Sequence, residues 1–163
     1  MTPATTQALA RMAGAAAWWA ASSFVVGRLA HSLDPARLQS MGGPTRLLRG
    51  EEGGRIYERA LRIRSWKGRL PEAGDLFEGG FNKKSLASLE PGTLARYMAE
   101  TKRAELTHMA LLPLALVPLA WVEGWELAVV VAYALAANLP FIIVQRYNRA
   151  RLLRLEQRRR RRG

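Results

Sequence analysis

The sequence predicts an all-α integral membrane protein with about three transmembrane helices and a cytoplasmic, interfacial region between the first and second helix. Uncharged, apolar residues are concentrated in three blocks, at residues 12–27, 109–122 and 127–145. The loop between the last two blocks is short and acidic, whereas the tail after them is strongly basic. The net charge of +12 therefore fits membrane topology better than nucleic-acid binding.

The three blocks differ in how nearly they reach the roughly 20 apolar residues that cross a bilayer. Block 127–145 is long enough alone, and block 109–122 reaches this length with flanking residues. Block 12–27 also reaches this length only with flanking residues, and Arg28 would then extend its charged group toward the membrane surface. A cleaved signal peptide remains an alternative there, because Arg11 precedes the apolar core. No clean small-residue cleavage site follows that core, so a retained helix is preferred.

Charge predicts the orientation of the hairpin formed by the second and third spans. The connecting loop reads EGWE, and the tail from Arg146 onward has nine arginines against one glutamate. Under the positive-inside rule, the loop is outside and the tail is cytoplasmic, in a multi-pass protein of the cell membrane. The predicted order is a transmembrane helix, a cytoplasmic basic region, a catalytic helix with the transmembrane hairpin, and a basic cytoplasmic tail, at residues 1–31, 32–92, 93–150 and 151–163.

The region before the second span has three parts. Residues 33–54 are rich in Gly, Pro and Arg and are predicted to be irregular. Residues 55–70 fit helical and strand spacing equally, so both remain open. In either form, Trp66 lies among basic residues, as in an interfacial segment. A helix is predicted to start near Thr93, which follows Pro-Gly and suits a helix cap.

Glu105 and His108 are the candidate catalytic residues. They lie in the stretch ETKRAELTH, where helical spacing places both on the stripe that faces protein or a cavity. A histidine accepts a proton from a hydroxyl near neutral pH, and a carboxylate on its other nitrogen would orient the ring. The alternative is a histidine at the level of the lipid headgroups with a neighbouring acid.

The remaining charges of this stretch, Glu100, Lys102 and Arg103, are predicted to lie on a solvated side of the helix. Glu100 and Arg103 are three residues apart and can pair there. A metal site is not expected, because the Glu-x-x-His unit occurs once and a di-metal site needs two copies. The chain has no cysteine and no Gly-x-Ser-x-Gly motif, which excludes thiolate chemistry and argues against a hydrolase triad.

Two long strings, ETKRAELTH before an apolar run and YALAANLPFIIVQRYNRARL, resemble the glycosyl-4,4'-diaponeurosporenoate acyltransferase family. Its members are small integral membrane enzymes of bacterial carotenoid-glycoside synthesis. The segment LRIRSWKGRLPEAG is similar to the family's aromatic and basic segment, and the resemblance covers residues 55–155. Ala150 departs from the pattern, in which a proline is expected.

The resemblance implies O-acyl transfer, without a cofactor, from acyl-CoA or a similar thioester to a sugar hydroxyl of a glycosylated carotenoid acid. His108 would be the base and Glu105 would orient it. The residues expected to bind the substrates, through the oxyanion or the CoA phosphates, are Arg64, Trp66, Lys67, Arg103, Gln145, Arg146, Asn148 and Arg149.

Two other functions stay open at this point. In the first, the same acyltransferase chemistry acts on another membrane glycolipid as the acceptor. The second is a non-enzymatic membrane adaptor that binds anionic lipid through its basic regions. The expected partners are the acyl donor, the glycosylated acceptor and membrane lipids, and the run RRRRR near the C-terminus is not taken as a nucleic-acid site.

Overall fold

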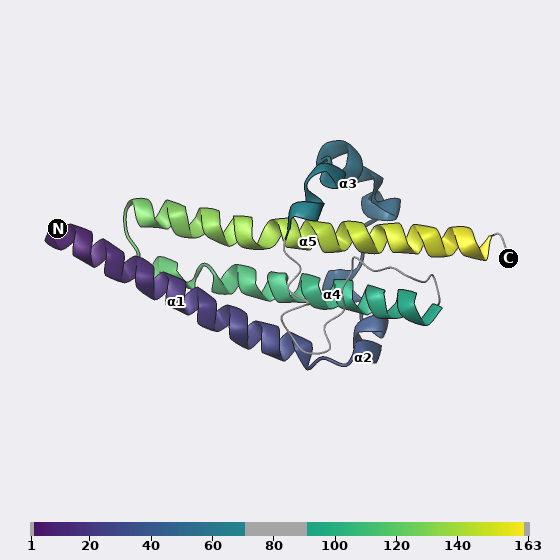
Figure 1. The fold of residues 1–163 in the computed structure, drawn as a ribbon, viewed down its shortest axis with the longest axis horizontal. Coiled ribbons are helices and arrows are strands. Elements are labelled where there is room, and N and C mark those ends of the chain that lie inside the picture. Colours follow the sequence, from purple (N-terminus) through teal and green to yellow (C-terminus); the bar gives the residue numbers. More distant parts are fainter. Residues whose placement is uncertain (1, 71–90, 162–163) are drawn as a thin grey trace.

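Three long helices dominate the computed structural model, which describes residues 2–70 and 91–161. They are α1 (Pro3–His31), α4 (Pro91–Leu114) and α5 (Trp125–Arg160). In Figure 1, α4 lies between α1 and α5 and runs antiparallel to both. All regular structure in the described ranges is helical, so the all-α prediction is confirmed.

Short helical segments connect α1 to α4 and cover the second half of α5. They are α2 (Pro35–Ser40), η1 (Gly43–Thr45), η2 (Arg49–Gly54), α3 (Arg55–Ala60), η3 (Ile63–Ser65) and η4 (Lys67–Arg69). A further 3-10 turn, η6 (Val117–Ala120), links α4 to α5. Figure 1 shows α3 above α5 and α2 below α4, on opposite sides of the long helices.

The structure corrects two expectations about helix positions and decides a third that was left open. Residues 33–54 contain helical turns, because the Asp34 carboxylate accepts a hydrogen bond from Ala36 N at 2.8 Å and starts α2. Of the two alternatives left open for residues 55–70, the helix is found, as α3 followed by 3-10 turns. Helix α4 begins at Pro91, so Thr93 lies inside the helix rather than capping it.

Within the described residues, one helix is long and apolar enough to cross a membrane, namely α5 over Trp125–Arg158. The mean hydropathy of its most apolar stretch is 2.4, and only 22% of that stretch is buried against the protein. Helix α4 falls short because its first half is charged and Pro113 interrupts its end. The arrangement with about three spans therefore stays a prediction.

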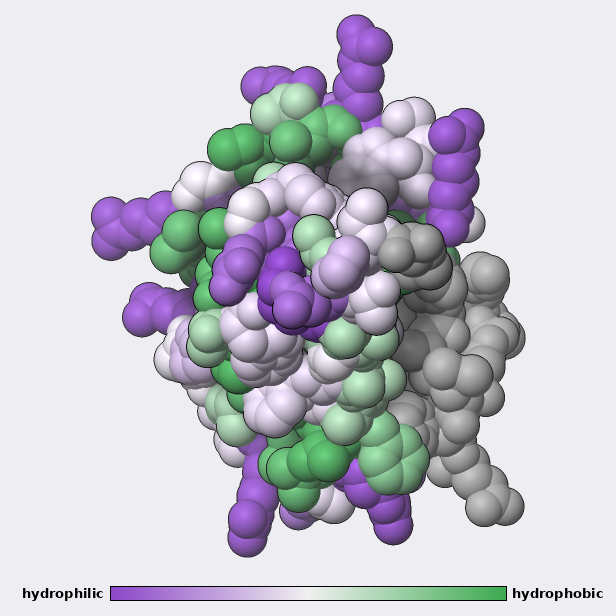
Figure 2. Space-filling model, turned by 90° about the vertical axis from the view of Figure 1, so that its left-hand side faces the viewer, coloured by the Kyte–Doolittle hydropathy of each residue, from purple (hydrophilic) through white to green (hydrophobic). Residues whose placement is uncertain are grey.

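The exposed large apolar side chains lie mainly on one half of the molecule, which we call the apolar half. It consists of α1, the end of α4 and residues 125–140 of α5. The exposed side chains there include Leu9, Trp18, Phe24, Val25, Leu29, Met109, Leu127, Val129, Val131, Tyr133, Leu135 and Leu139. Figure 2 views this end of the molecule, where pale residues of intermediate hydropathy surround a hydrophilic centre and green apolar patches lie above and below them. Such a large apolar surface is typical of contact with lipid or protein.

Polar contacts fix α1 against the other helices at both ends of the apolar half. The Arg11 guanidinium donates to both carboxylate oxygens of Glu126, at 2.8 and 2.7 Å. Trp18 Nε1 donates to Leu114 O at 2.8 Å. That carbonyl lies four residues before Pro118, which has no N–H to donate to it. The indole therefore satisfies a carbonyl group that the proline leaves unpaired.

Candidate functional site

His108 on α4 is held between two residues of α5. Its Nδ1 lies 3.1 Å from Oδ1 of Asn138, and its ring stacks on Phe141 with centroids 4.5 Å apart. Asn138 is 1% exposed, and its Nδ2 donates to Ala134 O at 2.8 Å, so its Oδ1 faces the imidazole. The amide oxygen thus accepts a hydrogen bond from Nδ1–H, and in this tautomer the ring's lone pair is on Nε2.

Glu105, one helical turn before His108, faces two arginines of α5. The carboxylate is 0% exposed, with Oε1 2.6 Å from Arg146 Nη1 and Oε2 2.6 Å from Arg149 Nη2. Arg146 Nη1 donates a hydrogen bond to Oε1, whereas the contact of Arg149 with Oε2 is an ion pair that lacks hydrogen-bond geometry. Both contacts couple α4 to α5. The buried position of Glu105 agrees with the predicted stripe, and the carboxylate forms ion pairs with both arginines.

Arg146 extends this ion-pair network to the connecting segments. Its Nε and Nη2 donate to the Glu51 carboxylate at 2.8 and 2.6 Å. The Tyr57 hydroxyl also donates to Glu51. Burial raises the pKa of Glu51, but hydrogen bonds from Arg146, Tyr57 and the backbone N–H of Leu48 outweigh it and lower the pKa to about 2. Burial and the hydrogen bond to Glu51 raise the pKa of Tyr57 to about 12.

Arg149 and Lys102 complete the buried network. Arg149 is 2% exposed, and its Nη2 donates to Thr45 O at 2.6 Å. Its Nη1 is buried and has no hydrogen-bond partner among the described residues. Burial, together with repulsion from Arg149, lowers the pKa of Lys102. The network of Glu51, Glu105, Lys102, Arg146 and Arg149 thus contains three cations and two anions.

The prediction that Lys102 lies on a solvated side of α4 is wrong, because this residue is only 9% exposed. Its Nζ donates to Gln39 O and Met41 O, at the end of α2. Arg103 donates to Ala30 O and His31 O, at the end of α1. Both side chains donate to backbone carbonyl groups at the C-terminal ends of other helices. The predicted pair between Glu100 and Arg103 is confirmed, at 3.2 Å.

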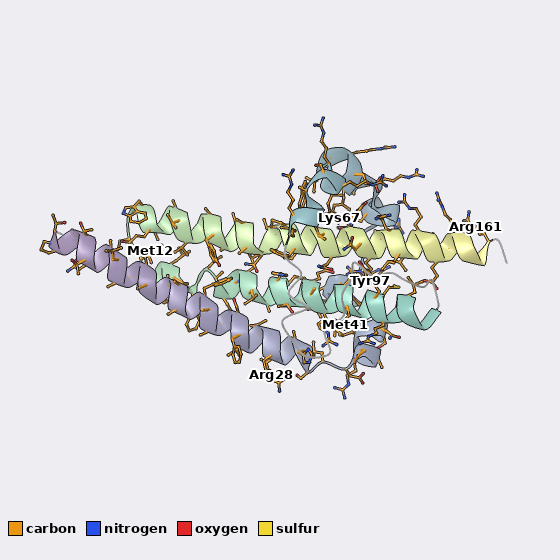
Figure 3. All side chains as sticks on the ribbon, viewed as in Figure 1. Met12, Arg28, Met41, Lys67, Tyr97 and Arg161 are labelled. Atoms are coloured by element: carbon orange, nitrogen blue, oxygen red, sulfur yellow. The ribbon has the colours of Figure 1, made fainter. Side chains whose placement is uncertain are left out.

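The remaining predicted binding residues gather around Tyr147, on a different face of α5. Lys67 Nζ donates to Asn148 Oδ1 at 3.2 Å and lies 5.2 Å from the centre of the Tyr147 ring. Arg64 donates to the Tyr147 hydroxyl at 3.4 Å and pairs with Glu58 at 2.8 Å. Figure 3 shows Lys67 and Met41 on opposite sides of the α4–α5 pair.

The last two predicted binding residues, Trp66 and Gln145, are both packed against the rest of the protein. Trp66 Nε1 donates to Leu61 O at 2.9 Å and packs against the cluster formed by Tyr57, Ile63, Val144 and Tyr147. Seven of the eight predicted binding residues therefore divide between the buried ion-pair network, the Tyr147 cluster and the cap of α1, and Gln145 lies buried on α5.

Sequence reasoning missed Asn138, Glu51 and Tyr147. Asn138 carries a signal, because it is a polar residue inside the uncharged run LAVVVAYALAANLPFIIVQ. Glu51 and Tyr147 carry none, because their partners are distant in sequence. In the described part of the chain, no group of three or more His, Cys, Asp or Glu side chains is placed to hold a metal ion.

Comparison with known proteins adds a family to this geometry. The family model described as glycosyl-4,4'-diaponeurosporenoate acyltransferase matches residues 44–158. The protein of that name from Staphylococcus aureus (strain N315) is 33% identical over 116 residues, covering 69% of this chain and 68% of the relative. Its namesake from Staphylococcus haemolyticus (strain JCSC1435) is 35% identical over 103 residues, covering 63% and 59%. No solved structure matches significantly.

Proposed function

The chain belongs to the glycosyl-4,4'-diaponeurosporenoate acyltransferase family and is an acyltransferase, and we propose that it acylates a sugar hydroxyl of a glycosylated carotenoid acid. The proposed donor is acyl-CoA. The observation that carries the site assignment is the contact between His108 and Asn138, which leaves the lone pair on Nε2. The pair lies where the apolar half meets the buried ion-pair network.

His108 is the general base in this proposal. As the sugar oxygen attacks the thioester carbonyl carbon, Nε2 takes the hydroxyl proton. Collapse of the tetrahedral intermediate breaks the carbon–sulfur bond. The imidazolium then returns the proton to the departing thiolate, so the products are the sugar ester and a free thiol.

Glu105 acts on the base through α5 in this account. It holds Arg146 and Arg149, and the same helix carries Asn138, which contacts the imidazole. We assign stabilisation of the developing oxyanion to Arg149, because its buried Nη1 has no hydrogen-bond partner among the described residues. The predicted role of Glu105 in orienting His108 is thereby kept, but as an indirect one.

The apolar half suits a polyene and an acyl chain. We propose that α1, α4 with η6, and α5 all enter the bilayer, with the basic tail in the cytoplasm. Asn138 and Arg146 are eight residues apart on α5, which corresponds to roughly 12 Å along the helix axis. With Arg146 at the cytoplasmic surface of the membrane, the imidazole lies just inside the lipid, where a sugar at the headgroups meets an acyl chain.

The function is tested by acyl transfer with the purified protein in lipid nanodiscs. Labelled acyl-CoA is offered with a glycosylated carotenoid acid, or with a bacterial diacylglycerol glycolipid, and products are identified by mass spectrometry. We expect acylated carotenoid glycoside. Transfer to the glycolipid alone would overturn the carotenoid acceptor, and transfer to neither from any thioester would overturn the proposed reaction.

A further inference from the structure

A cleft of about 630 Å³ opens beside the buried ion-pair network, between η1, η2 and α5. We call it the arginine cleft. Its lining includes Pro44, Arg46, Leu48, Arg49, Glu51 and Arg146. Arg146 belongs both to the cleft and to the network around Glu105, so the cleft adjoins the proposed active site.

The arginine cleft has an excess of positive charge at its surface. Arg46 and Arg49 are exposed and form no ion pair with any residue that the structure describes. Glu51 does not neutralise them, because its carboxylate is already held by Arg146, Tyr57 and Leu48 N. Two guanidinium groups are therefore available to an anionic ligand at the cleft.

The residues behind the cleft add positive charge of their own. The buried network contains one more cation than anion, and Nη1 of Arg149 has no hydrogen-bond partner in the described part of the chain. Repulsion from Arg149 also contributes to the lowered pKa of Lys102, as expected where positive charge is in excess. The positive electrostatic potential of this network is little screened by solvent at the cleft, because Arg146 itself forms part of the wall of the cleft.

We propose that the arginine cleft binds the phosphate groups of the acyl donor, a nucleotide-bearing thioester of the CoA type. The inference rests on the proposed function. Arginine binds phosphate oxygens through paired N–H groups, and several phosphates match several cations. From Arg146 to the level of Asn138, the axis of α5 spans roughly 12 Å, a separation that a flexible arm between the phosphates and the thioester can bridge.

The sequence-based expectation assigned the phosphates to Arg146 and Arg149 together with Arg62, Arg64 and Lys67, and this assignment keeps Arg146 but replaces Arg64 and Lys67. Arg64 is paired with Glu58, and Lys67 Nζ is bound to Asn148. Binding a phosphate there would require these contacts to be exchanged. The arginine cleft offers Arg46 and Arg49 without such a cost.

Direct titration of CoA tests the cleft without any chemistry. The full-length protein is placed in nanodiscs of zwitterionic lipid, and binding is measured by calorimetry. For Arg46→Glu/Arg49→Glu we expect Kd to rise at least about tenfold, because charge-assisted hydrogen bonds become repulsions. Arg37→Glu/Arg59→Glu is the matched control, since it makes the same charge change at exposed arginines outside the cleft. We expect it to bind CoA within about twofold of wild type.

Competitors identify the part of the donor that the cleft binds. Pyrophosphate is expected to displace CoA, and phosphate-free pantetheine is expected not to. Wild-type affinity in Arg46→Glu/Arg49→Glu would overturn the proposal. Equal weakening in both double variants would also overturn it, as would displacement of CoA by anionic lipid vesicles but not by pyrophosphate.

Steady-state kinetics separates this inference from the proposed function. In Arg46→Glu/Arg49→Glu we expect a raised KM for acyl-CoA, with kcat unchanged and with no change in KM for acyl-pantetheine. An unchanged KM for acyl-CoA overturns the cleft while acyl transfer stands. CoA binding that depends on the cleft, in a protein that acylates no carotenoid glycoside, keeps the cleft and overturns the acceptor.

Discussion

The two halves of α5 are stabilised in different ways. Residues 125–140 expose their apolar side chains, and their polar contacts are few, chiefly Arg11 with Glu126 and His108 with Asn138. Residues 141–160 carry the buried ion pairs to Glu105 and Glu51. The first half suits an environment that supplies apolar contacts, whereas the second supplies its own polar partners. The proposed active site lies at the change between them.

Removing the central carboxylate should produce the largest effect on the second half. Glu105→Leu leaves Arg146 and Arg149 buried without their shared partner, and we expect a loss of about 3–5 kcal/mol in the free energy of unfolding. Denaturant titration in detergent measures it.

The control is Glu123→Gln, which removes a carboxylate just before the first half of α5 that is 77% exposed and lies 3.5 Å from Arg11. We expect a change of about 0–1 kcal/mol. Equal losses in the two variants would contradict the difference between the halves of α5.

The contact of Gly54 with Tyr147 gives the next largest effect. Gly54 has a φ of 73°, and a Cβ there would lie 3.0 Å from the Tyr147 ring. We expect Gly54→Ala to cost about 1–3 kcal/mol of unfolding free energy. Gly68→Ala is the control, because open space surrounds that position, and its thermal midpoint should stay close to that of wild type. A stable Gly54→Ala protein would show that the η2 segment can move away from α5.

Asn138 is expected to affect rate more than stability. Asn138→Leu removes the acceptor for Nδ1–H, and we expect kcat to fall about tenfold or more. Asn138→Asp keeps an acceptor for Nδ1–H, and we expect it to retain more of the wild-type kcat than Asn138→Leu. Equal losses of kcat in the two variants would indicate that Asn138 has a packing role only.

The smallest predicted effect is a pH dependence of stability in the second half. The folded-state pKa of Glu51, about 2, is below the ordinary glutamate value of 4.5. Its contribution is therefore complete above pH 4.5 and is lost as the pH falls toward 2. Unfolding midpoints measured across this window should decrease more in wild type than in Glu51→Gln. Parallel curves would contradict the role of Glu51 as a partner of Arg146.

Helical spacing in the sequence predicted those features that are determined within a single helix. The all-α class, the pair between Glu100 and Arg103, and the buried position of Glu105 follow from local pattern. The contact of Asn138 with His108 depends on how α4 and α5 are aligned, which periodicity within either helix does not determine. Lys102 has the same limitation, because its acceptors are backbone carbonyls about sixty positions away.

The central claim is that His108 is the base at the boundary between the two halves, and the rate of acyl transfer tests it most directly. kcat is measured in nanodiscs with acyl-CoA and a glycosylated carotenoid acid, for wild type, His108→Gln and His31→Gln, which replaces the other histidine of the chain. We predict that His108→Gln lowers kcat at least about a hundredfold and that His31→Gln keeps the wild-type rate. A wild-type rate in folded His108→Gln would contradict the account.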